Sequence, residues 1–133
     1  MGFMNLFSKE EGPYVPVVDL PSTYTPTLYI SGMNTPACIQ FLINKEHFTI
    51  GAGAECDGIV DTPSLGLSRQ HAVIDYADGS YRLSDCRSTN GTYLNGKWLL
   101  PESPTPIKAG DQIRFGMAVF SVDEIVQEGS GDE

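Results

Sequence analysis

Basic residues are scarce in this sequence, and it has no long apolar run. Lys and Arg number 8 against 17 Asp and Glu, which gives a formal net charge of −9 over 133 residues. Non-specific nucleic-acid binding depends on the neutralisation of phosphates by Lys and Arg, so we expect no nucleic-acid partner. A membrane-spanning helix needs about 20 consecutive apolar residues, and the apolar runs here are only a few residues long. We therefore expect no membrane segment and no membrane partner.

Cysteine is also rare and is poorly placed for a structural role. The three cysteines, Cys38, Cys56 and Cys86, are odd in number and form no Cys-x-x-Cys motif. This pattern argues against a zinc site and against a disulfide framework. The first residues, MGFMNLFSKEEG, lack the basic start and the long apolar centre of a secretory signal. We predict a cytoplasmic protein that needs neither a metal nor a cofactor.

No long segment has the 3.6-residue apolar period of an amphipathic helix. Instead, short runs rich in Ile, Val, Tyr, Phe and Thr recur between Gly, Asn, Asp and Pro, which is typical of β-strands. Short strands at this density, over about 100 residues, favour a two-sheet β-sandwich. We predict an all-β fold with ten strands, at residues 27–31, 39–44, 48–51, 58–60, 72–76, 80–85, 92–94, 97–99, 112–115 and 118–125.

The two ends of the chain differ in composition from this middle part. Proline disfavours helix and favours extended backbone, and four prolines interrupt the first 26 residues: Pro13, Pro16, Pro21 and Pro26. The last six residues are only Gly, Ser, Asp and Glu, a composition typical of a solvated tail or linker. We predict an extended N-terminal arm over residues 1–26, a folded domain over 27–126, and an acidic, Gly-rich tail over 127–133.

Two of the predicted loops are rich in hydrogen-bond donors. The first is LSRQH, residues 67–71, in which Ser68 and Arg69 precede a strand. The second is STNGTYLNG, residues 88–96, whose two Asn-Gly pairs are typical of tight turns with positive φ. Hydroxyl, amide and guanidinium donors without paired carboxylates suit an oxyanion, and arginine matches phosphate with a bidentate fork. These segments therefore predict a phosphate-binding site where the fold brings them together.

Taken together, these segments resemble the forkhead-associated (FHA) domain family over residues 27–126. The matching motifs are Gly51, Ser-x-x-His at 68–71, Ser-Thr-Asn-Gly-Thr at 88–92, Asn-Gly at 95–96 and Gly-Asp at 110–111. The resemblance implies an eleven-stranded β-sandwich whose loops at one end bind phosphothreonine peptides. It implies that the peptide is contacted by Ser68, Arg69, Thr89 and Asn90. It implies scaffold roles for Gly51, His71, Gly91, Asn95 and Gly96.

One position departs from the family pattern. The family usually carries a phosphate-binding arginine directly after the glycine of its third strand, and this sequence has Ala52 there. No Lys or Arg occurs between Lys45 and Arg69 to replace it, and Arg87 or Lys97 would have to reach the phosphate from the other loop. A hydrogen bond to a charged group is worth about 1.5–3 kcal/mol, so its loss is expected to weaken phosphate binding by roughly one to two powers of ten or more.

Three kinds of function compete. The sequence favours a phosphothreonine-binding signalling module whose ligand is a partner protein, or its own N-terminal arm with Thr23 and Thr25. Ala52 supports the alternative, an interaction scaffold on the same fold that does not need phosphate. An enzyme is disfavoured, because Ser68 and His71 have no evident orienting acid and no GxSxG elbow is present. We predict no catalytic residue.

Overall fold

The computed structural model describes residues 24–125, so the predictions for residues 1–23 and 126–133 lie outside the described residues. Eleven strands and one short 3₁₀ helix follow each other along this part of the chain. They are β1 (Leu28–Gly32), β2 (Gln40–Leu42), β3 (His47–Gly51), β4 (Gly58–Ile59), η1 (Pro63–Leu65), β5 (Ala72–Ala77), β6 (Ser80–Asp85), β7 (Thr92–Leu94), β8 (Lys97–Trp98), β9 (Thr105–Ile107), β10 (Gln112–Phe115) and β11 (Ala118–Glu124).

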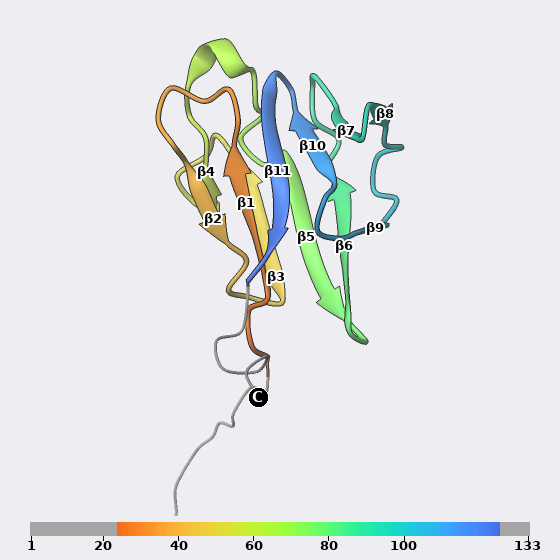
Figure 1. The fold of residues 1–133 in the computed structure, drawn as a ribbon. Coiled ribbons are helices and arrows are strands. Elements are labelled where there is room, and N and C mark those ends of the chain that lie inside the picture. The colour runs from red at the N-terminus through yellow and green to blue at the C-terminus, as the bar shows by residue number, and fades with distance from the viewer. Residues whose placement is uncertain (1–23, 126–133) are drawn as a thin grey trace, which may run out of the picture.

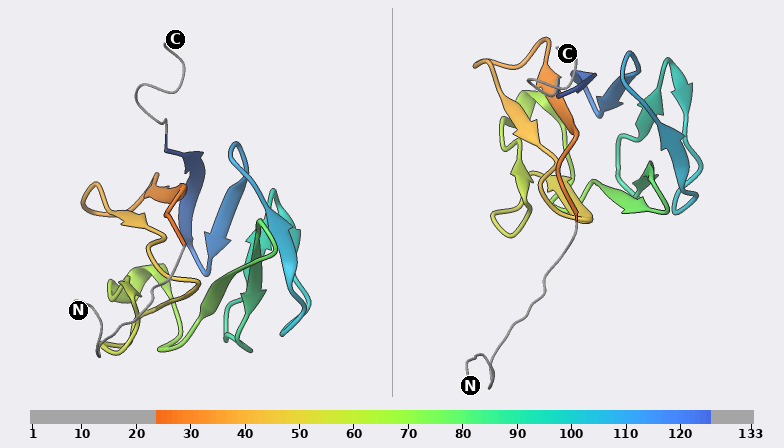
Figure 2. Two further views of the ribbon diagram at one scale, coloured as in Figure 1. Left: turned by 90° about the horizontal axis from the view of Figure 1, so that it is seen from below. Right: turned by 60° about the horizontal axis from the view of Figure 1, so that its bottom comes forward.

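The strands form two sheets that pack face to face as a β-sandwich (Figures 1 and 2). One sheet has six strands in the order β2-β1-β11-β10-β7-β8, and the other has five in the order β4-β3-β5-β6-β9. These strands pair in antiparallel fashion except β3 and β4, which are parallel. The predicted all-β sandwich of about eleven strands is therefore confirmed.

Apolar side chains that alternate along the strands fill the space between the sheets. On β6, Tyr81 and Leu83 are buried, whereas Arg82 between them is exposed. A strand with one face on the core and one in water requires this alternation. The largest fully buried apolar side chains come from both sheets and, in the case of Ile43, from the residue that follows β2: Ile30, Ile43, Ile50, Ile74, Leu83, Ile113, Phe115 and Phe120.

Strand β9 is the element that the residue pattern missed. All ten predicted strands are present with small shifts of their ends, but Thr105–Ile107 was not among them. Pro106, in the middle of this strand, interrupts the usual strand composition. Because β9 is an edge strand that pairs only with β6, the missing N–H of proline costs no interior ladder bond.

Five loops gather at one end of the sandwich, the upper end in Figure 1. They connect β1 to β2 (residues 33–39), β3 to β4 (52–57), β4 to β5 (60–71), β6 to β7 (86–91) and β10 to β11 (116–117). We call this end the loop end. The chain enters β1 and leaves β11 at the opposite end, since Leu28 pairs with Glu124. Within residues 24–125, no helix is long and apolar enough to cross a membrane.

Candidate functional site

The backbone of Ser68 and Arg69 is fixed against the end of strand β3. The Ala52 N–H donates to the Ser68 carbonyl at 2.9 Å, and the Gly53 N–H donates to the Arg69 carbonyl at 3.0 Å. A Cβ atom on Gly51 would lie 2.2 Å from the Arg69 carbonyl oxygen and 2.9 Å from that of Ser68. Only glycine allows the two segments to approach so closely.

His71 connects the 60–71 loop to the 86–91 loop through both nitrogens of its buried ring. Nδ1 accepts the Ser68 N–H at 3.0 Å, so Nε2 carries the proton and donates to the Gly91 carbonyl at 2.9 Å. Burial lowers the pKa of His71 below its ordinary value, against the opposing effects of the Gly91 hydrogen bond and the Asp85 charge. A neutral imidazole therefore sets the position of Ser68.

Asp85 organises the 86–91 loop from beneath. Its buried carboxylate accepts the Ser88 N–H at 3.0 Å, the Thr92 hydroxyl at 2.7 Å and the Ser88 hydroxyl. The Ser88 oxygen in turn accepts the Gly91 N–H at 2.9 Å. Burial would raise the pKa of Asp85, but these hydrogen bonds outweigh it and hold the pKa below its ordinary value. The carboxylate is therefore ionised and committed to the loop.

Hydrogen bonds between loops bring Ser68, Thr89 and Asn90 together at the loop end. Ser68 Oγ accepts the Thr89 N–H at 3.0 Å, and Asn90 Nδ2 donates to the Gly66 carbonyl at 2.8 Å. Thr89 and Asn90 are exposed. Among the described residues, no group accepts the Ser68 hydroxyl proton or donates to the Asn90 side-chain carbonyl. These two groups can therefore bind a ligand.

Arg69 supplies a positive charge beside these groups. Its side chain is 78% exposed, and Nη2 lies 3.1 Å from Glu55 Oε1 in a salt bridge. Glu55 lies in the 52–57 loop, three residues after Ala52, and its side chain is 45% exposed. The cation of the site is thus accessible to solvent, but an acid of the neighbouring loop already contacts it.

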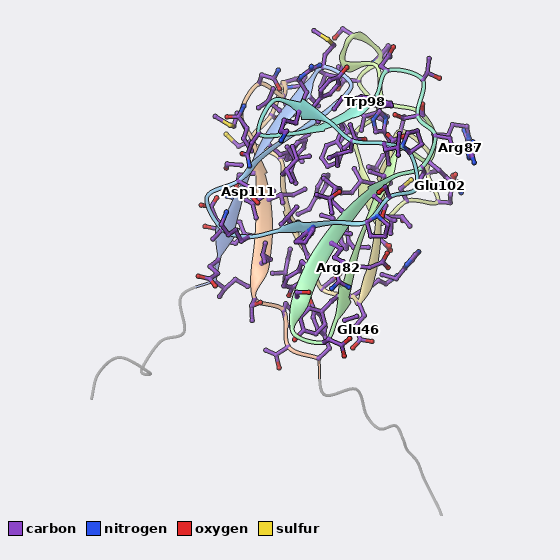
Figure 3. The ribbon with its side chains drawn as sticks, turned by 90° about the vertical axis from the view of Figure 1, so that its right-hand side faces the viewer. Glu46, Arg82, Arg87, Trp98, Glu102 and Asp111 are labelled. Atoms are coloured by element: carbon purple, nitrogen blue, oxygen red, sulfur yellow. The ribbon has the colours of Figure 1, made fainter. Side chains whose placement is uncertain are left out.

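The other basic and turn residues of the predicted site lie apart from this group. Arg87 pairs with Glu102, with Nε 2.9 Å from Oε2 (Figure 3). Asn95 and Gly96 form the β7–β8 turn, with φ of 51° and 84°. The Asn95 amide bonds Asp111 on the far side of that turn, at 3.0 Å. These two residues shape the hairpin and do not contact Ser68 or Arg69.

Two residues of the site were not predicted as such from the sequence. Asp85 is not among the predicted site residues, although the spacing Asp85-x-x-Ser88 is a known pattern for a side chain that binds nearby backbone N–H groups. Glu55 has no local signal, because its contact with Arg69 depends on how two loops meet. Among residues 24–125, no group of three or more potential metal ligands was found.

The family model for the FHA domain matches residues 48–116, more than half of the chain. The chain belongs to the FHA domain family. The match includes the segments of Ser68, His71 and Thr89 and ends just after strand β10.

Curated proteins with related sequences include other FHA proteins. The oxoglutarate dehydrogenase inhibitor of Corynebacterium diphtheriae is 32% identical over 77 residues, 58% of this chain and 50% of that protein. The human angiogenic factor with G patch and FHA domains 1 is 37% identical over 79 residues, 55% of this chain and 11% of that protein. The aligned part thus covers half or less of these relatives' own lengths.

Solved structures show the same fold. The N-terminal FHA domain of Rad53p from S. cerevisiae, in complex with a phosphothreonine peptide, superimposes with a TM-score of 0.66 at 24% identity. The superposition covers 74% of this chain and 94% of that one. At this level of identity, the similarity shows that the two chains share a fold.

Proposed function

We propose that this FHA domain is a phosphothreonine-peptide-binding signalling module that connects partner proteins, rather than an enzyme. The observation that carries this proposal is the meeting of Ser68, Arg69, Thr89 and Asn90 on two adjoining loops at the loop end. The Rad53p FHA domain, which has the same fold, was solved with a phosphothreonine peptide bound.

Each of the four side chains has a role that fits its chemistry. The Ser68 hydroxyl and the Arg69 guanidinium donate to phosphate oxygens, and charge-assisted bonds of this kind are the strong ones. Thr89 also contacts the phosphate or fixes the loop, because its N–H already bonds Ser68 Oγ. Asn90 bonds the peptide backbone beside the phosphothreonine, with its side-chain carbonyl as an acceptor. His71 and Gly51 hold this arrangement without contact to the ligand.

The affinity of this site is expected to be lower than the family pattern would give. Ala52 offers no second cation, and Arg69 must leave Glu55 before it can engage a phosphate with its full donor set. One missing charge-assisted bond corresponds to a loss of roughly ten- to a hundredfold in the dissociation constant. The net charge of −9 also disfavours the approach of a dianion.

The second candidate is a phosphate-independent interaction scaffold on the same fold. Two observations favour it, namely the absence of a cation at Ala52 and the engagement of Arg69 by Glu55. Such a scaffold would bind its partner through other surfaces, and phosphorylation of the partner would make no difference to binding.

The N-terminal arm is a candidate ligand of the site, but Thr25 lies too far from the loop end to bind the site of its own chain without rearrangement. Thr25 adjoins Tyr24, whose ring centroid lies 4.9 Å from that of Tyr76. Tyr76 lies near the end of β5 that is opposite the loop end. A phosphorylated Thr25 would have to leave this contact to reach Ser68. We therefore assign Thr25 to binding between molecules, while Thr23 lies outside the described residues.

A titration of the full chain with a degenerate phosphothreonine peptide pool tests the proposal. Calorimetry at low salt, where electrostatic attraction is least screened, should detect binding of the phosphorylated pool and none of its unphosphorylated twin. Arg69→Ala should weaken this binding by about tenfold or more. Because the Arg69 side chain is exposed, thermal unfolding should stay unchanged. Equal binding of both pools would favour the scaffold.

A further inference from the structure

Glu55 is the acidic side chain that a ligand at Arg69 must meet. Its Oε1 lies 3.1 Å from Arg69 Nη2, and both side chains are open to solvent. The carboxylate also lies over the backbone of Gly53, where a Cβ atom would be 2.6 Å from Oε1. The Gly53 N–H donates to the Arg69 carbonyl, so Glu55 is held beside the segment that carries the cation.

Two neighbouring acids are committed elsewhere. Asp57, in the same loop, accepts Lys45 Nζ at 2.7 Å and the Thr49 N–H at 3.0 Å. Asp85 is buried under the 86–91 loop and bonds Ser88 and Thr92 there. Glu55 differs from both, because its described partner, Arg69, is the group that a phosphate would take.

We propose that Glu55 makes this site selective for phosphothreonine flanked by Lys or Arg. The inference rests on the proposed function, because it concerns which phosphothreonine peptides the site prefers. A phosphothreonine carries about −1.5 to −2 charges at pH 7, and it replaces Glu55 as the partner of Arg69. Glu55 then stands without a cation close to the phosphate, where like charges repel each other.

A basic residue in the peptide removes this repulsion. When the phosphate pairs with Arg69, a Lys or Arg next to the phosphothreonine pairs with Glu55, so one ion pair on the surface is replaced by two. An acidic flank adds repulsion instead. Exposed ion pairs are worth up to about 1 kcal/mol, so a basic flank should improve the dissociation constant about two- to fivefold over a neutral one.

Fluorescence anisotropy with three phosphothreonine peptides tests this inference. The peptides share one length and carry Lys, Gln or Glu at the two positions on each side of the phosphothreonine, each with an unphosphorylated twin. The wild-type chain should bind the Lys peptide most tightly and the Glu peptide most weakly. In Glu55→Gln the ratio of the dissociation constants of the Glu and Lys peptides should fall towards one. The Gln peptide should bind this variant more tightly than it binds the wild type. In Glu55→Lys the order should reverse.

Glu124→Gln is the matched control, because it removes the same charge from an exposed position at the opposite end of the sandwich. It should keep the wild-type order. A preference that survives in Glu55→Gln would belong to the overall negative charge and would overturn the inference, as would equal binding of the three phosphopeptides. If no phosphopeptide binds better than its unphosphorylated twin, the proposed function itself fails, and this inference fails with it.

Discussion

Ala52 places a methyl group where the family pattern has a phosphate-binding arginine, yet the backbone around it keeps its contacts. Its N–H still donates to the Ser68 carbonyl, and Gly51 still allows the close approach of Arg69. The loop is therefore intact without the cation. At the scale of single residues, the charge of the site can be changed separately from its shape.

Ala52→Arg should strengthen phosphothreonine binding by roughly ten- to a hundredfold, because it adds a charge-assisted bond to the phosphate. The measurement is a calorimetric titration of wild type and variant with one phosphothreonine peptide. Ala54→Arg, which adds the same charge two residues further along the same loop, should give a much smaller gain. Equal gains in the two variants would mean that position 52 does not face the phosphate.

The convergence of Ser68, Thr89 and Asn90 could be expected from the sequence, since the motifs that contain them are local and specific. The Glu55–Arg69 pair could not. These residues are separated by 14 positions, and their contact depends on the hydrogen bonds that join the 52–57 loop to the Ser68 and Arg69 backbone. Donor-rich motifs predict what a loop can bind, but the nearest opposing charge is set by tertiary contacts.

At the scale of elements, the 86–91 loop depends on a single buried carboxylate. Asp85 ends strand β6 and accepts three hydrogen bonds from Ser88 and Thr92. The loop that carries Thr89 and Asn90 is therefore folded over an ionised group, and its shape is sensitive to that charge.

Asp85→Asn should lower the free energy of unfolding by about 2 kcal/mol, because one carboxylate oxygen becomes an amide donor facing hydroxyl and N–H groups that need an acceptor. Urea denaturation measures this change. Asp75→Asn on the adjacent strand β5, where the side chain is 44% exposed, should change stability by only about 0.5 kcal/mol or less. Similar losses in both variants would contradict the role given to Asp85.

The close contact between Gly51, at the end of β3, and the backbone of the 60–71 loop leads to a second prediction at the scale of elements. Gly51→Ala should destabilise the fold by about 1–3 kcal/mol and weaken peptide binding, because its Cβ would overlap backbone atoms of Arg69. Gly53→Ala is the control: its Cβ meets the flexible Glu55 side chain, which can move aside. If circular dichroism melts find the two variants equally stable, the close backbone contact is not what fixes Gly51.

Strand content was largely predictable at this scale, and the exception is instructive. Tyr81, Leu83 and Asp85 alternate with polar residues, so β6 is evident from its pattern. Strand β9 is not, because Pro106 occupies its centre, and only its position at a sheet edge makes that proline tolerable. Edge position is a property of the assembled sheet and has no mark in the local sequence.

At the scale of the whole molecule, the free energy of unfolding should fall in two stages as the pH is lowered. The pKa of His71 lies below its ordinary value of 6.5 in the folded protein. The unfolded chain therefore takes up a proton near pH 6.5 that the folded protein resists, and stability falls as the pH drops below that value. The carboxylates of Asp57, Asp85 and Asp111 have lowered pKa values, so their contribution is lost on further acidification, below about pH 4.

Urea denaturation at a series of pH values between about 7.5 and 5 should show the first stage as a steady loss of unfolding free energy. His71→Gln should flatten this part of the profile, while His47→Gln, at an exposed strand position, should retain it. If His71→Gln does not fold, the NMR titration of the His71 ring in the wild type replaces it. A ring that titrates at or above pH 6.5 would contradict the first stage.

The entry and exit of the sandwich are neighbours. The Ile125 N–H donates to the Thr27 carbonyl at 2.8 Å, and β1 and β11 run side by side from there towards the loop end (Figure 1). A domain built this way can be spliced into a surface turn of a host protein, or grafted onto a bead through either flank, with little disturbance of the host. In each arrangement the loop end points away from the site of attachment.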